Sequence, residues 1–414
     1  MARLQPVRGT HDLLPEDMRR HRYVIEMARE AVRLYGFDEI ATPIFEFTQV
    51  FARTLGDTSD IVTKEMYSFE DRNGDQLTLR PENTAGVARC FISEGLAQQA
   101  PLKYFYAGPM FRRERPQKGR LRQFHQIGIE LIGVASPAAD VDVIAAGHRV
   151  LSSLGLEDKV TLELNTLGDA ESREAYRDAL VAYLTPHRAA LSADSRDRLE
   201  RNPLRILDSK DDADKEIVAE APDFSDYLNE DSRTFFAGVE EGLSRIGIGY
   251  ELNPRLVRGL DYYGHTAFEF TTDALGAQGT VLAGGRYDGL IKLMGGPSTP
   301  GVGWAAGVER LAMLIDAESD SGAVLAIVPM GAAATEEAHK LAEGLRNSGY
   351  AVDVGYSGNL SRRMKRADRI GASAALILGD DELARNVVQV RDMKTGEQSE
   401  IALDDVTAGL AQYR

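Results

Sequence analysis

The spacing of apolar residues near the N-terminus predicts a helix followed by a strand. From Pro15 to Tyr35 apolar residues recur at the helical period, and Pro15 and Gly36 suit the first turn and the left-handed cap of this helix. The strand pattern from Phe37 to Phe47 contains Pro43, so we expect this strand at a sheet edge or at a contact with a second chain. The helix positions expected to supply most of the buried face are Met18, Tyr23, Ile25, Met27, Ala28, Val32 and Leu34.

The most informative pattern lies between Tyr104 and Gly133. Two apolar strands, Tyr104 to Met110 and Phe124 to Ile132, flank a basic loop, which predicts an antiparallel hairpin with a solvent-exposed tip. The loop sets six cations against one acid, Glu114. A solvated loop is the usual fate of such a charge run, but mutual repulsion favours a loop that binds phosphate. The cations are Arg112, Arg113, Arg115, Lys118, Arg120 and Arg122.

Further elements follow from shorter patterns. Met66 to Phe69 and Gln76 to Leu79 predict a hairpin, because an Asn-Gly turn joins them. The chain then enters a helix near Thr84, which places Glu82 at a strand-to-helix junction, where a side chain points into a site or simply favours the helix start. We also expect a helix from Ala138 to Leu154, a strand from Val160 to Leu164 and a helical insertion over about residues 169–246.

Three dense stretches follow the insertion. LVRGLDYYGHTAFEF, residues 256–270, places Arg258 and Tyr263 among apolar residues, and VLAGGRYDGLI, residues 281–291, is a strand with a polar tip. GVGWAAGVERLAMLI, residues 301–315, is a glycine-rich strand that enters a helix with Arg310 in its apolar middle. A cation there either extends to water or faces a buried anion.

The last part of the chain predicts a small α/β domain with mainly parallel strands. After a linker at residues 316–322, strands are expected at 324–328, 351–354 and 374–378, and helices at 335–347 and 360–370. The second helix is basic and is either a phosphate contact or a solvated face. Its cations are Arg362, Arg363, Lys365, Arg366 and Arg369.

Composition limits the possible functions. The 414 residues leave room for two or three domains, and the net charge of −16 argues against nucleic-acid binding driven by bulk charge, although local basic patches remain possible. The single cysteine, Cys90, excludes an internal disulfide and a thiolate zinc site, and the seven histidines lack HxxxH spacing, so we expect no metal site. No apolar run could cross a bilayer and no signal peptide begins the chain, so we expect a cytoplasmic protein without membrane contact.

The segments TLRPE, FRRERPQKGRLRQFHQ, LVRGLDYY and GGRYDGL, in this order, resemble class II aminoacyl-tRNA synthetases and most closely the histidyl-tRNA synthetase family. Motif 1 of the class is similar to Gly36 to Glu46, motif 2 to Tyr104 to Gly133 and motif 3 to Gly301 to Leu311. The resemblance implies an α+β fold, with an antiparallel sheet flanked by helices in a catalytic domain at residues 1–320. It also implies an anticodon-binding domain at 323–414 and a homodimer with motif 1 at its interface.

The resemblance also implies a reaction. The carboxylate of histidine would attack the α-phosphate of ATP, with Mg²⁺ on the leaving pyrophosphate, and the residues around the nucleotide would be Arg112, Glu114, Arg258 and Arg310. Arg112 and Arg258 would contact the α-phosphate and Arg310 the γ-phosphate. The histidine-binding residues would be Glu82, Thr84 and Gln126 at the ammonium group, Glu130 and Tyr263 at the ring, and Asn83 and Tyr262 beside them.

The second step implied by the resemblance is transfer of histidine to the 3′ end of tRNA(His). The tRNA contacts would be Arg115, Lys118, Arg120 and Arg122 at the loop tip and Arg362, Arg363 and Arg366 in the last domain. The alternative is a histidine-sensing, synthetase-like regulatory subunit of ATP phosphoribosyltransferase. Such a subunit is expected to lack the last domain and need not keep Arg112, Arg258 and Arg310, whereas this chain has all of these features.

Overall fold

The computed structural model describes residues 3–55, 65–117, 119–207, 209, 211–257, 262–315 and 323–414. The chain divides into two compact units, Met1–Ala317 and Glu318–Arg414, which are described separately below. The predictions for Arg258, Lys118 and the linker at 316–322 lie outside the described residues. Within the described ranges, no helix combines the length and the apolar character needed to cross a membrane.

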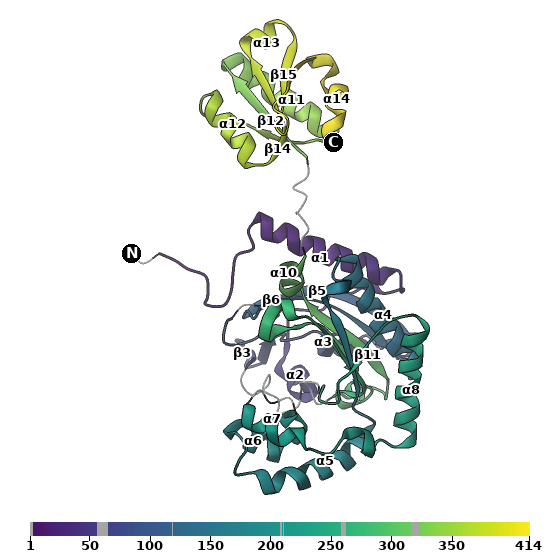
Figure 1. Cartoon of the computed structure of the whole chain (residues 1–414). Helices are drawn as coiled ribbons and strands as arrows, with labels where there is room; N and C mark the ends of the chain where they lie inside the picture. Colours follow the sequence, from purple (N-terminus) through teal and green to yellow (C-terminus); the bar gives the residue numbers. More distant parts are fainter. Residues whose placement is uncertain are drawn as a thin grey trace. The chain divides into compact units, whose positions relative to one another are not determined.

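A mixed, mainly antiparallel sheet forms the centre of the first unit (Figure 1). The outermost pairs, β1 with β5 and β7 with β8, are parallel, and every other pair in this sheet is antiparallel. Together with the flanking helices, this sheet confirms the expected α+β fold. In spatial order the strands are β1 (Asp38–Glu39), β5 (Leu102–Phe111), β6 (Gln123–Ile132), β11 (Gly301–Gly307), β10 (Thr280–Arg286), β9 (Gly264–Thr271), β7 (Thr161–Thr166) and β8 (Glu251–Leu252).

The predicted hairpin is confirmed as β5 and β6, which pair over their full length. Strand alternation divides its side chains between two faces of the sheet. Ile127, Ile129 and Leu131 join a core under four helices, α1 (Pro15–Arg33), α4 (Pro137–Ser153), α8 (Glu230–Arg245) and α10 (Val308–Leu314). Gln126 and Glu130 therefore face the other side, where the site described below is found.

Smaller helices and aromatic side chains cover that second face. Its core joins Tyr106 and Met110 of β5 to α2 (Thr48–Leu55), α3 (Thr84–Ser93) and α9 (Leu290–Leu293). Beside it lies a separate sheet of three strands in the order β2 (Phe45–Phe47), β4 (Gln76–Leu79) and β3 (Tyr67–Glu70). The predicted hairpin with the Asn-Gly turn is confirmed as β3 and β4.

Two details of the N-terminal predictions were wrong. The segment Phe37 to Phe47 is not one strand: β1 belongs to the large sheet and β2 to the small one, with Pro43 in the connection. Met18 and Tyr23 of α1, and Leu34 directly after it, are 40%, 39% and 62% exposed, so they do not form the buried face. The buried residues of α1 are His21, Val24, Ala28, Ala31 and Val32.

Residues 169–246 form helices, as predicted, with a small core of their own. The helices are α5 (Ala170–Leu184), α6 (Ala193–Arg201), α7 (Asp212–Ala219) and α8. Arg173 of α5 donates a hydrogen bond to the backbone carbonyl of Tyr263, so the insertion contacts the segment that carries a predicted ring-binding residue.

The second unit has a five-stranded sheet in the order β13, β12, β14, β15, β16. The three predicted strands are parallel neighbours, whereas the antiparallel pair β15 and β16 was not predicted. The strands are β12 (Val324–Met330), β13 (Ala351–Val354), β14 (Ala372–Gly379), β15 (Val387–Asp392) and β16 (Gln398–Ala402). The helices are α11 (Ala332–Asn347), α12 (Leu360–Arg369), α13 (Asp380–Ala384) and α14 (Val406–Gly409).

Candidate active site

A cavity of about 220 Å³ lies over the second face of the large sheet. Side chains reach it from the start of α3, the β5–β6 hairpin and its loop, strands β10 and β11, and α10. The structure thus brings together most of the site residues predicted for the first unit: Glu82, Thr84, Arg112, Glu114, Arg120, Gln126, Tyr262, Tyr263 and Arg310.

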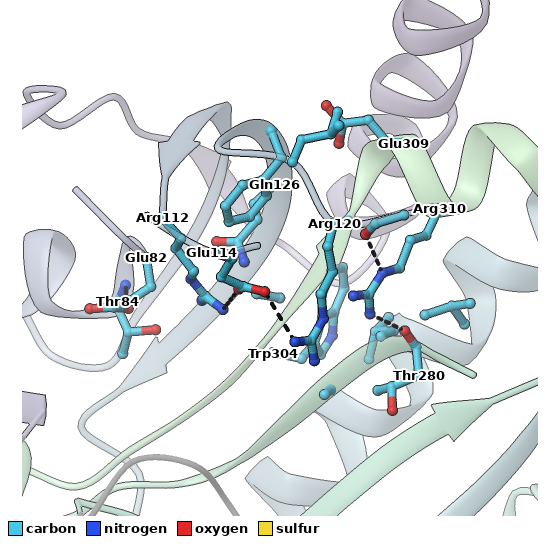
Figure 2. A pocket seen from close by; sticks show the side chains of 18 of the residues that line it. Glu82, Thr84, Arg112, Glu114, Arg120, Gln126, Thr280, Trp304, Glu309 and Arg310 are labelled. Atoms are coloured by element: carbon cyan, nitrogen blue, oxygen red, sulfur yellow. Dashed lines mark hydrogen bonds and ion pairs between the residues drawn. The ribbon is translucent and has the colours of Figure 1, made fainter. Parts of the chain in front are cut away.

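Three guanidinium groups line this cavity (Figure 2). Arg112 and Arg120 lie on either side of Glu114, with their Nη1 atoms 3.9 and 3.1 Å from the Glu114 carboxylate oxygens. Arg310 approaches from α10, and its Nη1 donates to the carbonyl oxygen of Thr280 at 2.7 Å. Three guanidinium groups thus lie close together around Glu114, an arrangement suited to a polyanion.

The pKa of Arg310 reflects its burial close to other guanidinium groups. Burial, followed by the neighbouring guanidinium of Arg120, lowers the pKa of Arg310 below its usual value. A phosphate group here would relieve the repulsion, because an opposite charge stabilises the charged form of each guanidinium. The backbone also holds Arg310 in place, since its Nε donates to the carbonyl oxygen of Gly119 at 3.1 Å.

Two contacts orient the Arg112 side chain, a hydrogen bond and a stacking contact with an aromatic ring. It directly follows β5, and its Nε donates to the carbonyl oxygen of Pro81 at 2.9 Å. Its guanidinium lies 5.4 Å from the ring centroid of Phe124, the second residue of β6. A stacked and hydrogen-bonded arginine loses less conformational freedom when it binds a phosphate.

Carboxylate and amide groups also line the cavity, with Glu82 and Thr84 beside Arg112 (Figure 2). Glu82 is 5% exposed, and its carboxylate accepts hydrogen bonds from the backbone N–H groups of Thr84 at 2.5 Å and Ala85 at 3.0 Å. Burial raises the pKa of Glu82. Gln126 lines the same region, and its Oε1 is buried without a hydrogen-bond partner among the described residues. An acceptor of this kind suits an ammonium group.

Glu130 is 1% exposed and does not itself line the cavity, although Thr84, to which it is hydrogen-bonded, does. It accepts hydrogen bonds from the hydroxyl groups of Thr84 at 2.7 Å and Tyr287 at 2.5 Å. Burial raises the pKa of Glu130 to about 8. Gly303 on the neighbouring strand makes the arrangement possible, because a Cβ there would overlap a Glu130 carboxylate oxygen.

Tyrosines enclose the space around Glu130. The ring centroids of Tyr262 and Tyr263 lie 4.6 Å apart, and that of Tyr287 lies 6.0 Å from Tyr262 and 6.4 Å from Tyr263. The Tyr106 hydroxyl reaches the Glu130 carboxylate at 3.5 Å. Aromatic walls with hydroxyl groups suit a planar, polar ring, because they combine stacking surface with hydrogen-bonding groups.

Several predicted residues lie elsewhere. Asn83 is 1% exposed, and its side-chain oxygen accepts hydrogen bonds from Thr42 at 2.6 Å and Arg80 at 3.2 Å, so it buttresses the start of α3. Arg115 and Arg122 do not line the cavity; the backbone N–H of Arg122 donates to the carbonyl oxygen of Gly9.

The basic helix of the second unit is partly engaged with its own domain. Arg366 makes two hydrogen bonds to Asp353, at 2.9 and 2.7 Å, and Arg363 donates to the carbonyl oxygens of Gly358 and Pro329. Arg362 is exposed. Of the three predicted tRNA contacts in this unit, Arg362 is therefore the best placed to meet a phosphate.

Sequence reasoning missed several residues of the site. Tyr106, Phe124, Thr280 and Trp304 line the cavity, and Tyr287 holds Glu130. Tyr287 and Trp304 lie within the GGRYDGL and GVGWAAG stretches that drew attention, but only the pairing of β10 with β11 and of β11 with β6 brings these strands beside Glu130.

Comparison with known proteins gives a consistent picture. A family model described as histidyl-tRNA synthetase matches residues 9–311, and one described as an anticodon binding domain matches residues 325–413. The histidine–tRNA ligase of Rhodospirillum rubrum is 64% identical over 414 residues and is covered in full, as is this chain. The histidine–tRNA ligase of Gluconacetobacter diazotrophicus is 59% identical over 411 residues, which is 99% of each chain.

Solved structures agree. The apo histidyl-tRNA synthetase of S. aureus superposes with a TM-score of 0.82 at 37% identity, covering 98% of this chain and 99% of that chain. A protein from Bacillus halodurans C, described as an ATP phosphoribosyltransferase regulatory subunit/histidyl-tRNA synthetase, has a TM-score of 0.67 at 22% identity. The superposition covers 91% of this chain and 98% of the Bacillus halodurans protein, and at 22% identity the likeness establishes a shared fold but no shared function.

The sheet, the hairpin with its basic loop and the arginine that follows β11 together have the arrangement of a class II aminoacyl-tRNA synthetase, as the sequence motifs indicated. Within that class, the chain belongs to the histidyl-tRNA synthetase family.

Proposed function

We propose that this chain is a histidine–tRNA ligase, which activates histidine with ATP and then transfers it to the 3′ end of tRNA(His). One observation carries the proposal from the structure: a single cavity is lined both by three guanidinium groups and by carboxylate and amide acceptors suited to an ammonium group. The full-length identity of 64% to a protein named histidine–tRNA ligase supports it independently.

In the first step the carboxylate of histidine attacks the α-phosphorus of ATP. A bond forms from this oxygen to phosphorus, the bond to the bridging oxygen of the β-phosphate breaks, and pyrophosphate leaves with the electron pair. Arg112 contacts the α-phosphate and Arg310 the γ-phosphate, where fixed cations stabilise the charge that develops in the transition state. Glu114 holds Arg112 and Arg120 in position.

Mg²⁺ enters this reaction with its substrate, because ATP binds to such sites as the magnesium complex and the ion neutralises the leaving pyrophosphate. Arg258, which the resemblance places at the α-phosphate, stays a prediction because it lies outside the described residues.

Histidine binds with its ammonium group toward Glu82 and Gln126 and its ring toward Glu130 and Tyr263. A neutral imidazole has one N–H donor and one acceptor nitrogen, and Glu130 and Tyr263 together satisfy both. An amino acid without this ring would leave Glu130 and Tyr263 unpaired, which accounts for rejection without an editing site. Thr84 acts indirectly, since its hydroxyl donates to Glu130 at 2.7 Å.

The transfer step requires tRNA at the mouth of the cavity and on the second unit. We assign the acceptor end to the motif 2 loop, with Arg115, Arg120 and Arg122 as phosphate contacts, and the anticodon to residues 323–414. The match of residues 325–413 to an anticodon binding domain supports the second assignment. Residues 1–320 would then form the catalytic domain.

We further propose a homodimer in the cytoplasm. The support for a dimer is an apolar surface around motif 1 that is unusual for a protein surface. Ile44, Phe45, Phe47 and Phe69 are 43%, 49%, 50% and 46% exposed, and they gather on the small sheet and the connection that leads into it. A second copy of this chain would cover these side chains.

The histidine-sensing regulatory subunit is the less favoured reading. The likeness to the Bacillus halodurans protein shows that the fold alone does not separate the two functions. The cation cluster around Arg112 and Arg310 does separate them, because a sensor of histidine has no need to bind a triphosphate.

Charging of total tRNA with labelled histidine tests the proposal, with the charged species identified by its anticodon. The ligase should charge tRNA(His) alone and should have no effect on the catalytic subunit of ATP phosphoribosyltransferase. Failure to charge any tRNA, combined with stimulation of that subunit by histidine, would establish the regulatory alternative instead.

A further inference from the structure

Three side chains converge where α1, β6 and α10 meet. His21 comes from α1, His125 from β6 and Glu309 from α10, and their potential ligand atoms all lie within 4.8 Å of one another. His125 directly precedes Gln126 in β6, so it points to the opposite face of the sheet from the amide that lines the cavity. These residues lie far apart in sequence, and the absence of HxxxH spacing therefore says nothing about them.

Two members of the cluster, His125 and Glu309, are already hydrogen-bonded to each other. The ring Nδ1 of His125 lies 2.9 Å from Glu309 Oε1, and the backbone N–H of His125 donates to both Glu309 oxygens, at 2.9 and 3.0 Å. The ring centroids of His21 and His125 are 5.4 Å apart and nearly perpendicular. Both carboxylate oxygens of Glu309 are thus oriented by the backbone of β6.

His21 is the unusual member. It is 5% exposed, it occupies the buried face of an otherwise apolar helix stripe, and its Nδ1 has no hydrogen-bond partner among the residues the structure describes. Burying an unsatisfied polar atom lowers stability, so an apolar residue would stabilise α1 better if packing were the only role of this position.

We propose that His21, His125 and Glu309 bind a first-row transition-metal dication, with Zn²⁺ the best chemical match. Two imidazoles and one carboxylate are a ligand set that Zn²⁺ uses with nitrogen and oxygen ligands at about 2.0–2.2 Å. Ligand atoms around one such ion lie about 3–4 Å apart, so small side-chain rotations bring this cluster to that spacing.

Space for the remaining ligands is present next to the cluster. A cavity of about 640 Å³ is bordered by His21 and Glu309, together with Asp17 and the N-terminal residues His11 and Asp12. Water entering from this side would complete the coordination sphere, as in zinc sites that keep an open position. The bound ion would tie α1 to β6 and α10, directly behind Gln126 and Arg310.

Metal binding to the full-length protein tests the proposal. Zn²⁺ titrated against a chromophoric chelator should bind with one ion per chain, and it should raise the temperature of thermal unfolding, because a ligand that binds only the folded state stabilises it. His21→Phe, which fills the buried position with an apolar ring, should weaken Zn²⁺ binding by more than about 100-fold, since even residues that only support metal ligands are worth about 10–100-fold.

His148→Phe is the matched control. His148 also faces a carboxylate, with its Nε2 3.8 Å from Glu157, but it belongs to no three-ligand group in the described part of the chain. This variant should bind Zn²⁺ as the wild type does. Equal binding by wild type and His21→Phe, or no binding by the wild type, would overturn the proposal.

A measurement on the wild-type protein tests the proposal even if the His21→Phe variant misfolds. Loaded with one equivalent of Cu²⁺, which such ligand sets bind most tightly, the wild type should give an electron paramagnetic resonance signal coupled to two imidazole nitrogens. A signal from one imidazole or none would show that the cluster does not bind the ion as a unit.

Discussion

At the scale of single residues, Glu130 is the group whose chemistry the protein changes most clearly. Burial raises its pKa to about 8, although Thr84 and Tyr287 donate hydrogen bonds to it. The carboxyl group therefore holds a proton near neutral pH. A donor such as an imidazole N–H, or a nearby ammonium group, favours the carboxylate form and should displace that proton.

We expect histidine binding to release close to one proton per chain at pH 7, and Glu130→Gln to abolish most of this release. Calorimetry in buffers with different ionisation enthalpies measures the proton count. An unchanged proton count in Glu130→Gln would assign the release to another group and would remove Glu130 from the ring contact.

The same pKa predicts how stability depends on pH. The folded protein keeps this proton to a higher pH than the unfolded chain, so the contribution to stability is present below the ordinary glutamate pKa and is lost as pH rises toward about 8. The free energy of unfolding should therefore fall less steeply in Glu130→Gln than in the wild type between pH 5 and 8. Parallel curves for the two proteins would contradict the raised pKa.

Arg310 allows a second prediction at this scale. Arg310→Ala should lower histidine-dependent ATP–pyrophosphate exchange by about 10²–10³-fold, the loss typical for one preorganised donor at a transition state. Arg245→Ala is the control, because Arg245 pairs with Glu241 on the exposed surface of α8 and does not line the cavity. Loss of activity in both variants would point to a general effect on folding rather than to a phosphate contact.

At the scale of elements, the sequence predicted where helices and strands lie better than it predicted which of their side chains are buried. The β5–β6 hairpin was predictable because its two apolar strands and charged loop leave no other arrangement. The buried face of α1 was not, because Met18 and Tyr23 look suitable for burial, and the position of β6 and α10 decides which side of the helix is covered. The roles of Asn83 and Thr84 depended on the side chains of Thr42 and Glu130, which lie far away in the sequence, so no local pattern contains them.

Arg286 shows how such a partner changes the interpretation of a motif. It lies in GGRYDGL, yet it is fully buried and bonds Asp140 of α4, with its Nε 3.0 Å from a carboxylate oxygen. Its Nη1 also reaches the carbonyl oxygen of Val134 at 3.0 Å. The residue therefore anchors β10 to α4 and does not line the cavity.

We expect Arg286→Ala to lower the free energy of unfolding by about 3–5 kcal/mol, because it leaves Asp140 charged and buried without its partner. Denaturant unfolding of the two proteins gives this difference. Arg245→Ala is the matched control: that pair with Glu241 is 74% and 64% exposed and should contribute less than about 0.5 kcal/mol. Similar losses in both variants would contradict the structural role of Arg286.

At the scale of the whole molecule, the division into two units with separate cores was predictable from the linker composition and the change to a strand–helix alternation. The convergence of Arg112, Arg120 and Arg310 was not, because their positions meet only through strand order. The resemblance to a known family, and not the residue pattern, was what placed Arg112 and Arg310 at one nucleotide. The cluster of His21, His125 and Glu309 had no such precedent in the sequence reasoning and emerged only from the fold.

Removal of residues 323–414 should leave histidine-dependent ATP–pyrophosphate exchange within a few-fold of the full chain and reduce tRNA charging by several orders of magnitude. The reason is that the cavity is built entirely from the first unit, whereas the proposed anticodon contacts lie in the second. Unaltered charging by the truncated chain would show that the second unit does not bind the anticodon.

The most direct test of the central claim is ATP–pyrophosphate exchange by the full-length protein, measured with each of the standard amino acids in turn. Exchange should depend on histidine alone, because in the proposed binding mode only an imidazole pairs with Glu130 and Tyr263 while its carboxylate lies beside the arginines. Exchange supported by a different amino acid, or by none, would contradict the assignment of this cavity.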